Sequence, residues 1–241
     1  TFTSIKHKID KSTTIIKNDV MKNLADISIW KWYFPWRGNY NQEKIDNMIQ
    51  ALTDYYRSQG YLDFNVSEYK FIETKGIFDN DKTTLLINIE SGPEYYVEDV
   101  SFNGNYIFND SIITSQIKFN SGDTFNGMQF DISNMNLSNL YRDKGYLFSQ
   151  IIPSFIPMAK DSLNINFDIN EKSIVKINKI IIKGNDTTKE NVIRRDIDIF
   201  PNQIFSQSDL MESYRRLAML NFFESIVPDI KPINEEEVDV I

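Results

Sequence analysis

Residues 180–197 read IIIKGNDTTKENVIRRDI, and this stretch decides how the chain is organised. An apolar strand pattern ends at Gly184-Asn185, and a helix pattern starts directly afterwards. A phosphate-binding turn needs several backbone N–H groups aimed at one anion, as in G-x-G-x-x-G or G-x-x-x-x-G-K-S/T. The stretch has one glycine and neither pattern. We therefore interpret it as a structural corner, with a capping box formed by Thr187 and Glu190 at the helix start.

The same corner occurs once more in the chain. The stretch VSFNGN, residues 100–105, places Gly104 and Asn105 where IIIKGN has Gly184 and Asn185. A recurring strand and corner is typical of a repeat of one small structural unit.

A helix end followed by an aromatic residue is a second recurring feature. It reads YYRSQGYLDFNV at 55–66, LYRDKGYLFSQI at 140–151 and LAMLNFFESIV at 217–227. Gly60 and Gly145 occupy the same place, and Asn221 replaces them in the third copy. Glycine and asparagine both tolerate the left-handed backbone conformation that closes a helix C-terminus, so we expect three structural helix ends here.

Together these features predict an α+β chain of three units, each with the element order βααββ. We expect the boundaries 1–92, 93–172 and 173–241, with the last strand of the third unit truncated at Ile241. The predicted strands are Phe2–Ile9, Phe64–Ile72, Thr84–Glu90, Val97–Phe102, Phe148–Ile156, Ser162–Asn170, Lys176–Lys183, Glu224–Ile230 and one from Glu237 onward. The predicted helices are Thr13–Leu24, Gln42–Ser58, Asn109–Ile117, Met128–Asp143, Thr188–Asp196 and Ser206–Leu220, the last burying Leu210, Tyr214, Leu217 and Leu220.

Composition argues against several classes of function. The net charge of -8 and the pI near 4.8 disfavour nucleic-acid binding and electrostatic docking on anionic lipid. The chain has no cysteine, and its one histidine, His7, lies in the first strand between two lysines. We therefore expect no catalytic residue, metal or cofactor, and no enzyme. The alternative, an enzyme built on α+β repeats, would need a deep pocket with clustered carboxylates.

The chain resembles the POTRA (polypeptide-transport-associated) domains of BamA, the outer-membrane barrel assembly factor. The third copy is similar in KIIIKGNDTTKENVIRRDI, YRRLAMLNFFESIVPDI and EEEVDV, and it resembles the domain next to the barrel. The second copy is similar in VEDVSFNGN and LYRDKGYLFSQIIPSFIP. The first copy is similar in YYRSQGYLDFNV, but Ile9-Asp10-Lys11 replaces its Gly-Asn corner.

This resemblance implies that each module has a three-stranded mixed sheet of order 1-3-2 with two helices on one face. It also implies a periplasmic scaffold that continues beyond Ile241 into a membrane β-barrel. The partners it implies are unfolded outer-membrane proteins, assembly-machine lipoproteins and the chain's own barrel. The alternative within the superfamily is the POTRA region of a two-partner secretion or translocation pore.

In a sheet of order 1-3-2 the second strand is an edge, which can accept another strand by β-augmentation. Proline cannot donate to such a ladder, and it interrupts the second strand of modules two and three but not of module one. We therefore predict strand pairing at the edge of module one, although all three edges can also be ordinary exposed strands without a specific partner. The prolines are Pro153, Pro157, Pro228 and Pro232, and the predicted edge residues are Phe64, Val66, Glu68, Lys70 and Ile72.

Two further groups are candidate contact sites. The stretch WKWYFPWRGNY at 30–40 contains Trp30, Trp32 and Trp36, which can pack onto their own module, contact a partner protein or lie at a membrane interface. The resemblance implies that Arg195 and Asp196 dock a companion lipoprotein, with aspartate where the family more often has glutamate. The alternative is an exposed helix charge that pairs with its neighbour.

Overall fold

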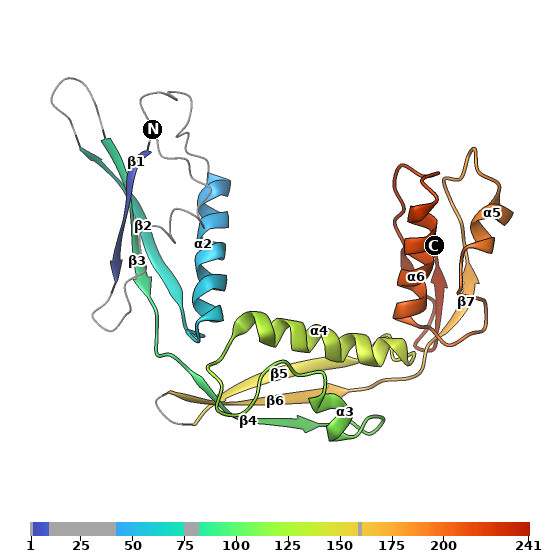
Figure 1. Cartoon of the computed structure of the whole chain (residues 1–241), viewed down its shortest axis with the longest axis horizontal. Coiled ribbons are helices and arrows are strands. Elements are labelled where there is room, and N and C mark those ends of the chain that lie inside the picture. Colours follow the sequence, from blue (N-terminus) through green and yellow to red (C-terminus); the bar gives the residue numbers. More distant parts are fainter. Residues whose placement is uncertain (1, 10–41, 75–81, 159–160) are drawn as a thin grey trace. The chain divides into compact units, whose positions relative to one another are not determined.

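The computed structural model describes residues 2–9, 42–74, 82–158 and 161–241. These residues form three sheets, each accompanied by its own helices (Figure 1). In every sheet the strand that comes last in the chain lies between the other two, in the orders β1-β3-β2, β4-β6-β5 and β7-β9-β8. The predicted α+β class and the strand order 1-3-2 are therefore confirmed. The predicted helix 13–24 and the aromatic stretch 30–40 lie outside the described residues.

The chain packs as two compact units, and the middle module contributes to both. The first unit comprises Thr1–Asp99, Phe119–Asp131 and Ile156–Asn164. The second comprises Val100–Lys118, Ile132–Phe155 and Ile165–Ile241. The junction between modules one and two thus belongs to the first unit, and the junction between modules two and three belongs to the second.

In the part of module one that the structure describes, one helix packs against a mixed sheet. Strand β1 (Phe2–Ile9) pairs in parallel with β3 (Lys82–Glu90), which pairs antiparallel with β2 (Asn65–Thr74). Helix α2 (Gln42–Ser58) lies alongside this sheet (Figure 1). Its apolar residues recur at intervals of three and four residues, so one face of the helix is buried. The buried core is Ile45, Met48, Leu52, Tyr56, Phe64, Ile87 and Ile89.

Module two contains two helices between its first and second strands. The elements are β4 (Tyr96–Asn103), α3 (Asp110–Thr114), α4 (Gly127–Asp143), β5 (Gln150–Pro157) and β6 (Ser162–Asn170). Helix α3 begins where the side chain of Asn109 accepts a hydrogen bond from the backbone N–H of Ile112 at 3.0 Å. The central strand β6 buries every second residue, as expected for a strand with one face on the core. The buried residues of β6 are Leu163, Ile165, Phe167 and Ile169.

Module three repeats this order with shorter strands. Its elements are β7 (Lys176–Ile180), α5 (Glu190–Arg195), α6 (Gln207–Met219), β8 (Ile230–Pro232) and β9 (Glu237–Val240). Strand β9 pairs in parallel with β7 and antiparallel with β8. The buried core is Val175, Ile177, Ile199, Phe205, Leu210, Val238 and Val240.

Two predicted strands of module three were wrong in extent. Strand β7 ends at Ile180 instead of Lys183, because the sequence ends at Ile241 and leaves its partner β9 only Glu237–Val240. Strand β8 covers Ile230–Pro232 instead of Glu224–Ile230. A strand exists only where a neighbour supplies hydrogen bonds, and β9 offers four residues for pairing.

The predicted capping box at Thr187 and Glu190 was also wrong. Helix α5 starts at Glu190, and the preceding Lys189 makes no side-chain cap. Residues 185–188 form a turn instead, in which Asn185 Nδ2 donates to the carbonyl of Thr188 at 3.0 Å. The Glu190 carboxylate accepts a hydrogen bond from Arg194 Nε at 2.7 Å.

The buried face of α6 differs in part from the prediction. Leu210 and Leu217 are buried as predicted, whereas Tyr214 and Leu220 are half-buried. Ser213 is buried although it is polar. Its hydroxyl accepts from the backbone N–H of Asp198 at 2.9 Å and donates to the carbonyl of Asp209 at 2.8 Å, so both of its hydrogen-bonding roles are satisfied.

Candidate functional site

The second strands of the three modules, each at one edge of its sheet, differ in length and in proline content. Strand β2 has 10 residues without a proline, β5 has 8 residues including Pro153 and Pro157, and β8 has 3 residues and ends at Pro232. A proline inside a strand occupies a position whose N–H would face away from the ladder, so it removes a donor from the open edge. Among the described second strands, β2 is thus the longest, and no proline removes a donor from its open edge.

The predicted residues of this edge fall into two groups. Phe64 precedes β2 and is buried in the core, and Val66 packs against the same core. A bulge lies between Val66 and Glu68. After it, Glu68, Lys70 and Ile72 are exposed, and Lys70 Nζ lies 3.2 Å from a Glu68 carboxylate oxygen. A bulge adds one residue to a strand and shifts the alternation of faces, so the five residues do not form one continuous row.

The Arg195-Asp196 pair lies at the end of α5. Arg195 Nη2 is 3.5 Å from the Asp196 carboxylate, and the arginine side chain is 72% exposed whereas the aspartate side chain is 25% exposed. The neighbouring Arg194 is occupied elsewhere, because it pairs with Glu190 and donates to the backbone carbonyl of Ile180 at 3.0 Å. Arg195 is therefore the arginine of α5 that presents its charge most openly to solvent.

The two Gly-Asn corners have the same local structure. Gly104 and Gly184 have φ angles of 80° and 74°, in the left-handed region that favours glycine. Asn105 Nδ2 donates to the carbonyl three residues later at 3.1 Å, and Asn185 makes the equivalent bond at 3.0 Å. Each asparagine thus holds its own turn closed, which is a structural role.

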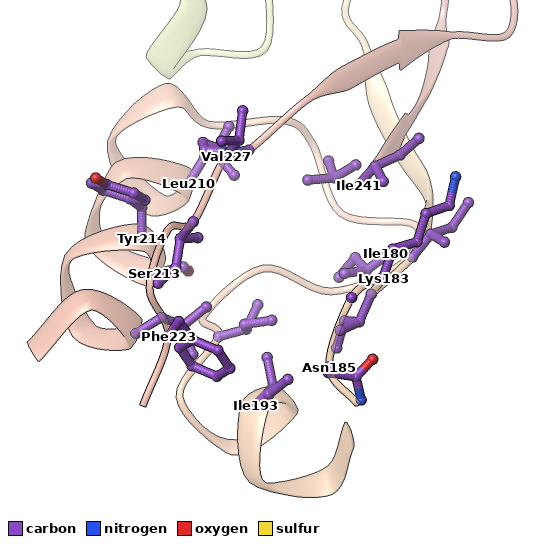
Figure 2. A pocket seen from close by; sticks show the side chains of 18 of the residues that line it. Ile180, Lys183, Asn185, Ile193, Leu210, Ser213, Tyr214, Phe223, Val227 and Ile241 are labelled. Atoms are coloured by element: carbon purple, nitrogen blue, oxygen red, sulfur yellow. The ribbon is translucent and has the colours of Figure 1, made fainter. Parts of the chain in front are cut away.

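A mostly apolar pocket of about 190 Å³ lies next to the second corner. Figure 2 shows the side chains of Ile193, Leu210 and Phe223 around it, with Lys183 and Asn185 at its side. The pocket lies between the residues that follow β7, the helices α5 and α6, and the segment 223–228. The carboxylate cluster expected of an α+β enzyme is not among its lining residues.

Comparison with module two explains this pocket. The Tyr96 N–H donates to the Asp161 carbonyl at 2.9 Å, and the Lys176 N–H donates to the Glu236 carbonyl at 2.8 Å, so β6 and β9 start at equivalent residues. A Cβ atom added to Gly104 would overlap the carbonyl oxygen of Ile169 near the end of β6, whereas one added to Gly184 would meet no atom within 4 Å. The pocket is thus the place that the second half of β6 fills in module two, and we assign no ligand to it.

The structure gives Gly60 and Gly145 a role that sequence reasoning missed. Both have the expected left-handed φ angles, 97° and 91°, and both also join successive modules. The Gly60 carbonyl accepts from the Tyr95 N–H at 2.9 Å, and the Gly145 carbonyl accepts from the Val175 N–H at 2.8 Å. The sequence pattern predicts a helix end at each glycine. It contains no signal that the start of the next module donates a hydrogen bond to the carbonyl of that glycine.

The described residues contain no group of three or more His, Cys, Asp or Glu side chains that could hold a metal ion. Within the same ranges, no helix has the length and apolar character needed to cross a membrane.

Comparison with known proteins identifies the repeat. The sequence matches the family described as "POTRA: Surface antigen variable number repeat" over residues 7–92, 95–172 and 175–241. The chain belongs to the POTRA family. Its three POTRA domains are arranged in tandem and are related to the POTRA regions of BamA proteins.

Several similar proteins are named outer membrane protein assembly factor BamA. BamA of Nitratidesulfovibrio vulgaris is 25% identical over an alignment of 243 positions, which covers 98% of this chain and 30% of that protein. BamA of Neorickettsia risticii is 25% identical over 203 residues, which are 83% of this chain and 26% of that protein. The chain spans about a quarter to a third of the length of these curated relatives. The crystal structure of Haemophilus influenzae BamA POTRA3-5 covers 99% of the chain with a TM-score of 0.80 at 16% identity, and 93% of that structure is matched, which supports the POTRA fold.

The candidate contact sites can be placed on the POTRA domains. The open edge β2 belongs to the first POTRA domain, and the Arg195-Asp196 pair belongs to the third. Trp30, Trp32 and Trp36 fall in the sequence of the first domain and outside the described residues.

Proposed function

We propose that the three POTRA domains form the periplasmic arm of an outer-membrane protein assembly factor. In this role they bind unfolded outer-membrane proteins and accessory lipoproteins, and they assist the folding and insertion of barrels next to the chain's own C-terminal β-barrel. The proposal is supported by the tandem match to the POTRA family and by relatives named outer membrane protein assembly factor BamA. BamA POTRA domains are a non-enzymatic family, so the proposed mechanism is scaffolding without bond chemistry or a cofactor.

The edge of β2 is the observation that carries the client-binding part of this proposal. An unfolded barrel strand has unpaired backbone groups, and an edge strand can pair with them without reading a defined sequence. The edge of β2 has 10 residues and no proline, and Glu68, Lys70 and Ile72 are exposed beside it. Backbone pairing with weak side-chain selection suits a scaffold that handles many clients.

An NMR titration with an extended peptide from a barrel strand tests this edge. We expect backbone amide shifts concentrated in Asn65–Thr74. Shifts confined to the second and third domains would contradict strand pairing at β2. They would not affect the assignment of the chain to the POTRA family.

A pair of proline variants gives a matched control for the same titration. Along an antiparallel edge strand, the backbone N–H groups of successive residues point alternately into the sheet and out toward solvent. Lys70→Pro and Phe71→Pro affect neighbouring residues, so one variant removes a hydrogen bond to β3 and the other removes a donor from the open edge. We expect the variant that keeps the stability of the first domain to be the one that loses peptide binding. Full binding by that variant would contradict pairing at this edge.

The proposed lipoprotein contact is tested separately. Arg195 offers an exposed charge at the end of α5, and Asp196 beside it is half-buried. We expect Arg195→Glu to weaken binding of the companion lipoprotein to the third domain, and Arg215→Glu on α6 serves as a control of similar exposure. Equal losses from both variants would indicate a general effect of charge, and the contact at α5 would then be rejected.

A further inference from the structure

Helix α4 carries an apolar stripe on its solvent-facing side. Met128, Ile132 and Met135 are 66%, 39% and 56% exposed. At 3.6 residues per turn these positions fall within an arc of about 60° on the helix surface. All three belong to one continuous helix, so their alignment follows from helix geometry alone. The buried Leu137 and Tyr141 lie on the opposite side of the helix.

The fold does not require apolar residues at these places, as module three shows. The backbone N–H of Lys118 donates to the Ser133 hydroxyl of α4, and the backbone N–H of Asp198 donates to the Ser213 hydroxyl of α6, both at 2.9 Å. Equivalent residues of α4 and α6 therefore differ by 80 in residue number. The α6 positions equivalent to the stripe are Ser208, Glu212 and Arg215. Two of these form an ion pair of 3.3 Å, which makes the corresponding face of α6 polar.

Module one gives the same result. Gly60 and Gly145 end the equivalent helices α2 and α4, so equivalent residues of these helices differ by 85 in residue number. The equivalent positions on α2 are Glu43, Asn47 and Gln50, all of which are polar and exposed. Of the three long helices that the structure describes, α4 is therefore the one with an apolar outward face, and this face is specific to module two.

The residues beside the stripe indicate the charge of its partner. Asp131 is exposed, precedes Ile132 directly and lies one turn before Met135. Its carboxylate makes no ion pair or hydrogen bond with another described residue. No lysine or arginine occurs in α4 before Arg142. Amphipathic helices that bind membrane surfaces are rich in lysine and arginine on their polar face, so this stripe does not match a lipid surface.

The dimensions of the stripe indicate the kind of element that covers it. A stable homodimer buries about 800 Å² on each partner, far more than three side chains on one helix provide. The spacing i, i+4, i+7 forms a straight ridge, which fits the groove of a second helix. Methionine is flexible and polarisable, and it adapts to partners of different shape.

We propose that α4 docks an amphipathic helix of a partner protein, whose apolar face covers Met128, Ile132 and Met135 and whose basic residue pairs with Asp131. This contact is independent of strand pairing at β2, so either one can fail without the other.

Titration of the 241-residue chain with two synthetic helical peptides tests the proposal. Both carry leucines at i, i+4 and i+7, and the flanking residues are lysines in one and glutamates in the other. We expect amide shifts centred on residues 128–135 and an affinity for the lysine peptide about two- to fivefold higher. Asp131→Asn should remove this difference. Equal affinity for both peptides in the unsubstituted chain would overturn the proposed pairing.

Substitutions on the stripe complete the test. We expect the combined variant Met128→Gln, Ile132→Gln, Met135→Gln to bind the lysine peptide at least about tenfold more weakly. The control variant Met211→Gln, Met219→Gln removes exposed methionines of α6 and should bind normally. If the combined variant melts at a lower temperature, Met135→Gln alone replaces it.

Other occupants of the stripe give distinct results. Equal losses of peptide binding in the stripe and control variants would refute the docking site. If the chain binds phosphatidylglycerol vesicles and the stripe variant does not, the stripe contacts a membrane. If the chain forms a concentration-dependent dimer and the stripe variant does not, the stripe contacts a second copy. Either result would overturn the proposal.

Discussion

Two equivalent tyrosines have different surroundings. Tyr56 of α2 and Tyr141 of α4 each precede the helix-closing glycine by four residues, and both are buried. The Tyr141 hydroxyl donates to the Glu171 carboxylate at 3.0 Å. The Tyr56 hydroxyl has no hydrogen-bond partner among the described residues. A buried hydroxyl without a partner costs stability, whereas a satisfied one contributes to it.

This difference predicts opposite results for the same substitution. We expect Tyr141→Phe to lower the free energy of unfolding by about 1.5 kcal/mol, since a hydrogen bond to a charged acceptor is lost. Tyr56→Phe should leave it unchanged or raise it by up to about 1 kcal/mol. Urea denaturation of both variants measures the difference, and a loss from Tyr56→Phe as large as that from Tyr141→Phe would contradict it.

Burial of Tyr56 also predicts a loss of stability at alkaline pH. Burial raises the pKa of Tyr56 from 10.0 to about 12, because the phenolate would lose its hydration. The folded state therefore keeps its proton where the unfolded state releases it. The contribution of protonated Tyr56 to the free energy of unfolding is fully present below pH 10. It is lost as the pH rises from about 10 to 12, at about 1.4 kcal/mol per pH unit.

Denaturation curves between pH 8 and 11 measure this effect. The comparison is between the unsubstituted chain and Tyr56→Phe, which lacks the titrating group. We expect the difference in unfolding free energy between the two proteins to change only above about pH 10. Parallel curves over the whole range would show that Tyr56 titrates normally.

At the scale of elements, the Gly-Asn corners predict unequal effects of one substitution. Alanine at either glycine must adopt a positive φ, which costs about 1–2 kcal/mol. At Gly104 the added Cβ would also overlap the Ile169 carbonyl of β6, whereas at Gly184 it would enter open space, because the 241-residue chain ends before β9 reaches the length of β6. We expect Gly104→Ala to destabilise the chain by about 2–5 kcal/mol and Gly184→Ala by about 1–2 kcal/mol. Thermal unfolding compares the two, and equal shifts would show that the close approach of β6 adds nothing.

The elements also show which predictions sequence supports. Helix α2 was predicted at Gln42–Ser58, β1 at Phe2–Ile9 and β6 at Ser162–Asn170, and the structure has these bounds. Long periodic segments carry their own pattern of burial, so their extent is encoded locally. Strands β7 and β8 differ from their predicted bounds because both pair with β9, which stops one residue before the last residue of the sequence.

The side of α4 that faces solvent could not be inferred in the same way. Apolar residues occur around much of its circumference, with Phe130, Leu137 and Tyr141 buried and Met128 and Met135 exposed. Helical periodicity identifies apolar positions, but it does not say which of them pack against the sheet when both sides carry them. Burial in the folded module resolves this ambiguity.

At the scale of the whole molecule, the junction glycines predict a loss of coupling between modules. A Cβ atom added to Gly145 would overlap the Ile204 side chain of module three. Gly122 has the same φ of 91° and no atom within 4 Å of an added Cβ, so Gly122→Ala isolates the cost of the backbone angle. We expect Gly145→Ala to be more destabilising by about 1–3 kcal/mol and to speed amide exchange at Val175.

Hydrogen exchange and ¹⁵N relaxation measure this coupling. In Gly145→Ala the amides of module three should tumble more independently of those of module two, while Gly122→Ala should keep the original behaviour. If Val175 exchanges at the same rate in both variants, the junction does not depend on the close contact at Gly145.

The sequence by itself determined the repeat, the α+β class and most helices, because hydrophobic periodicity and turn residues act over a few neighbouring positions. The strand order came from the resemblance and was confirmed by the fold. Tertiary structure alone decided which residues of the next module reach Gly60 and Gly145, and that α4 presents an apolar face to solvent. Each of these depends on contacts between residues far apart in the chain, and a local pattern does not encode the partner of such a contact.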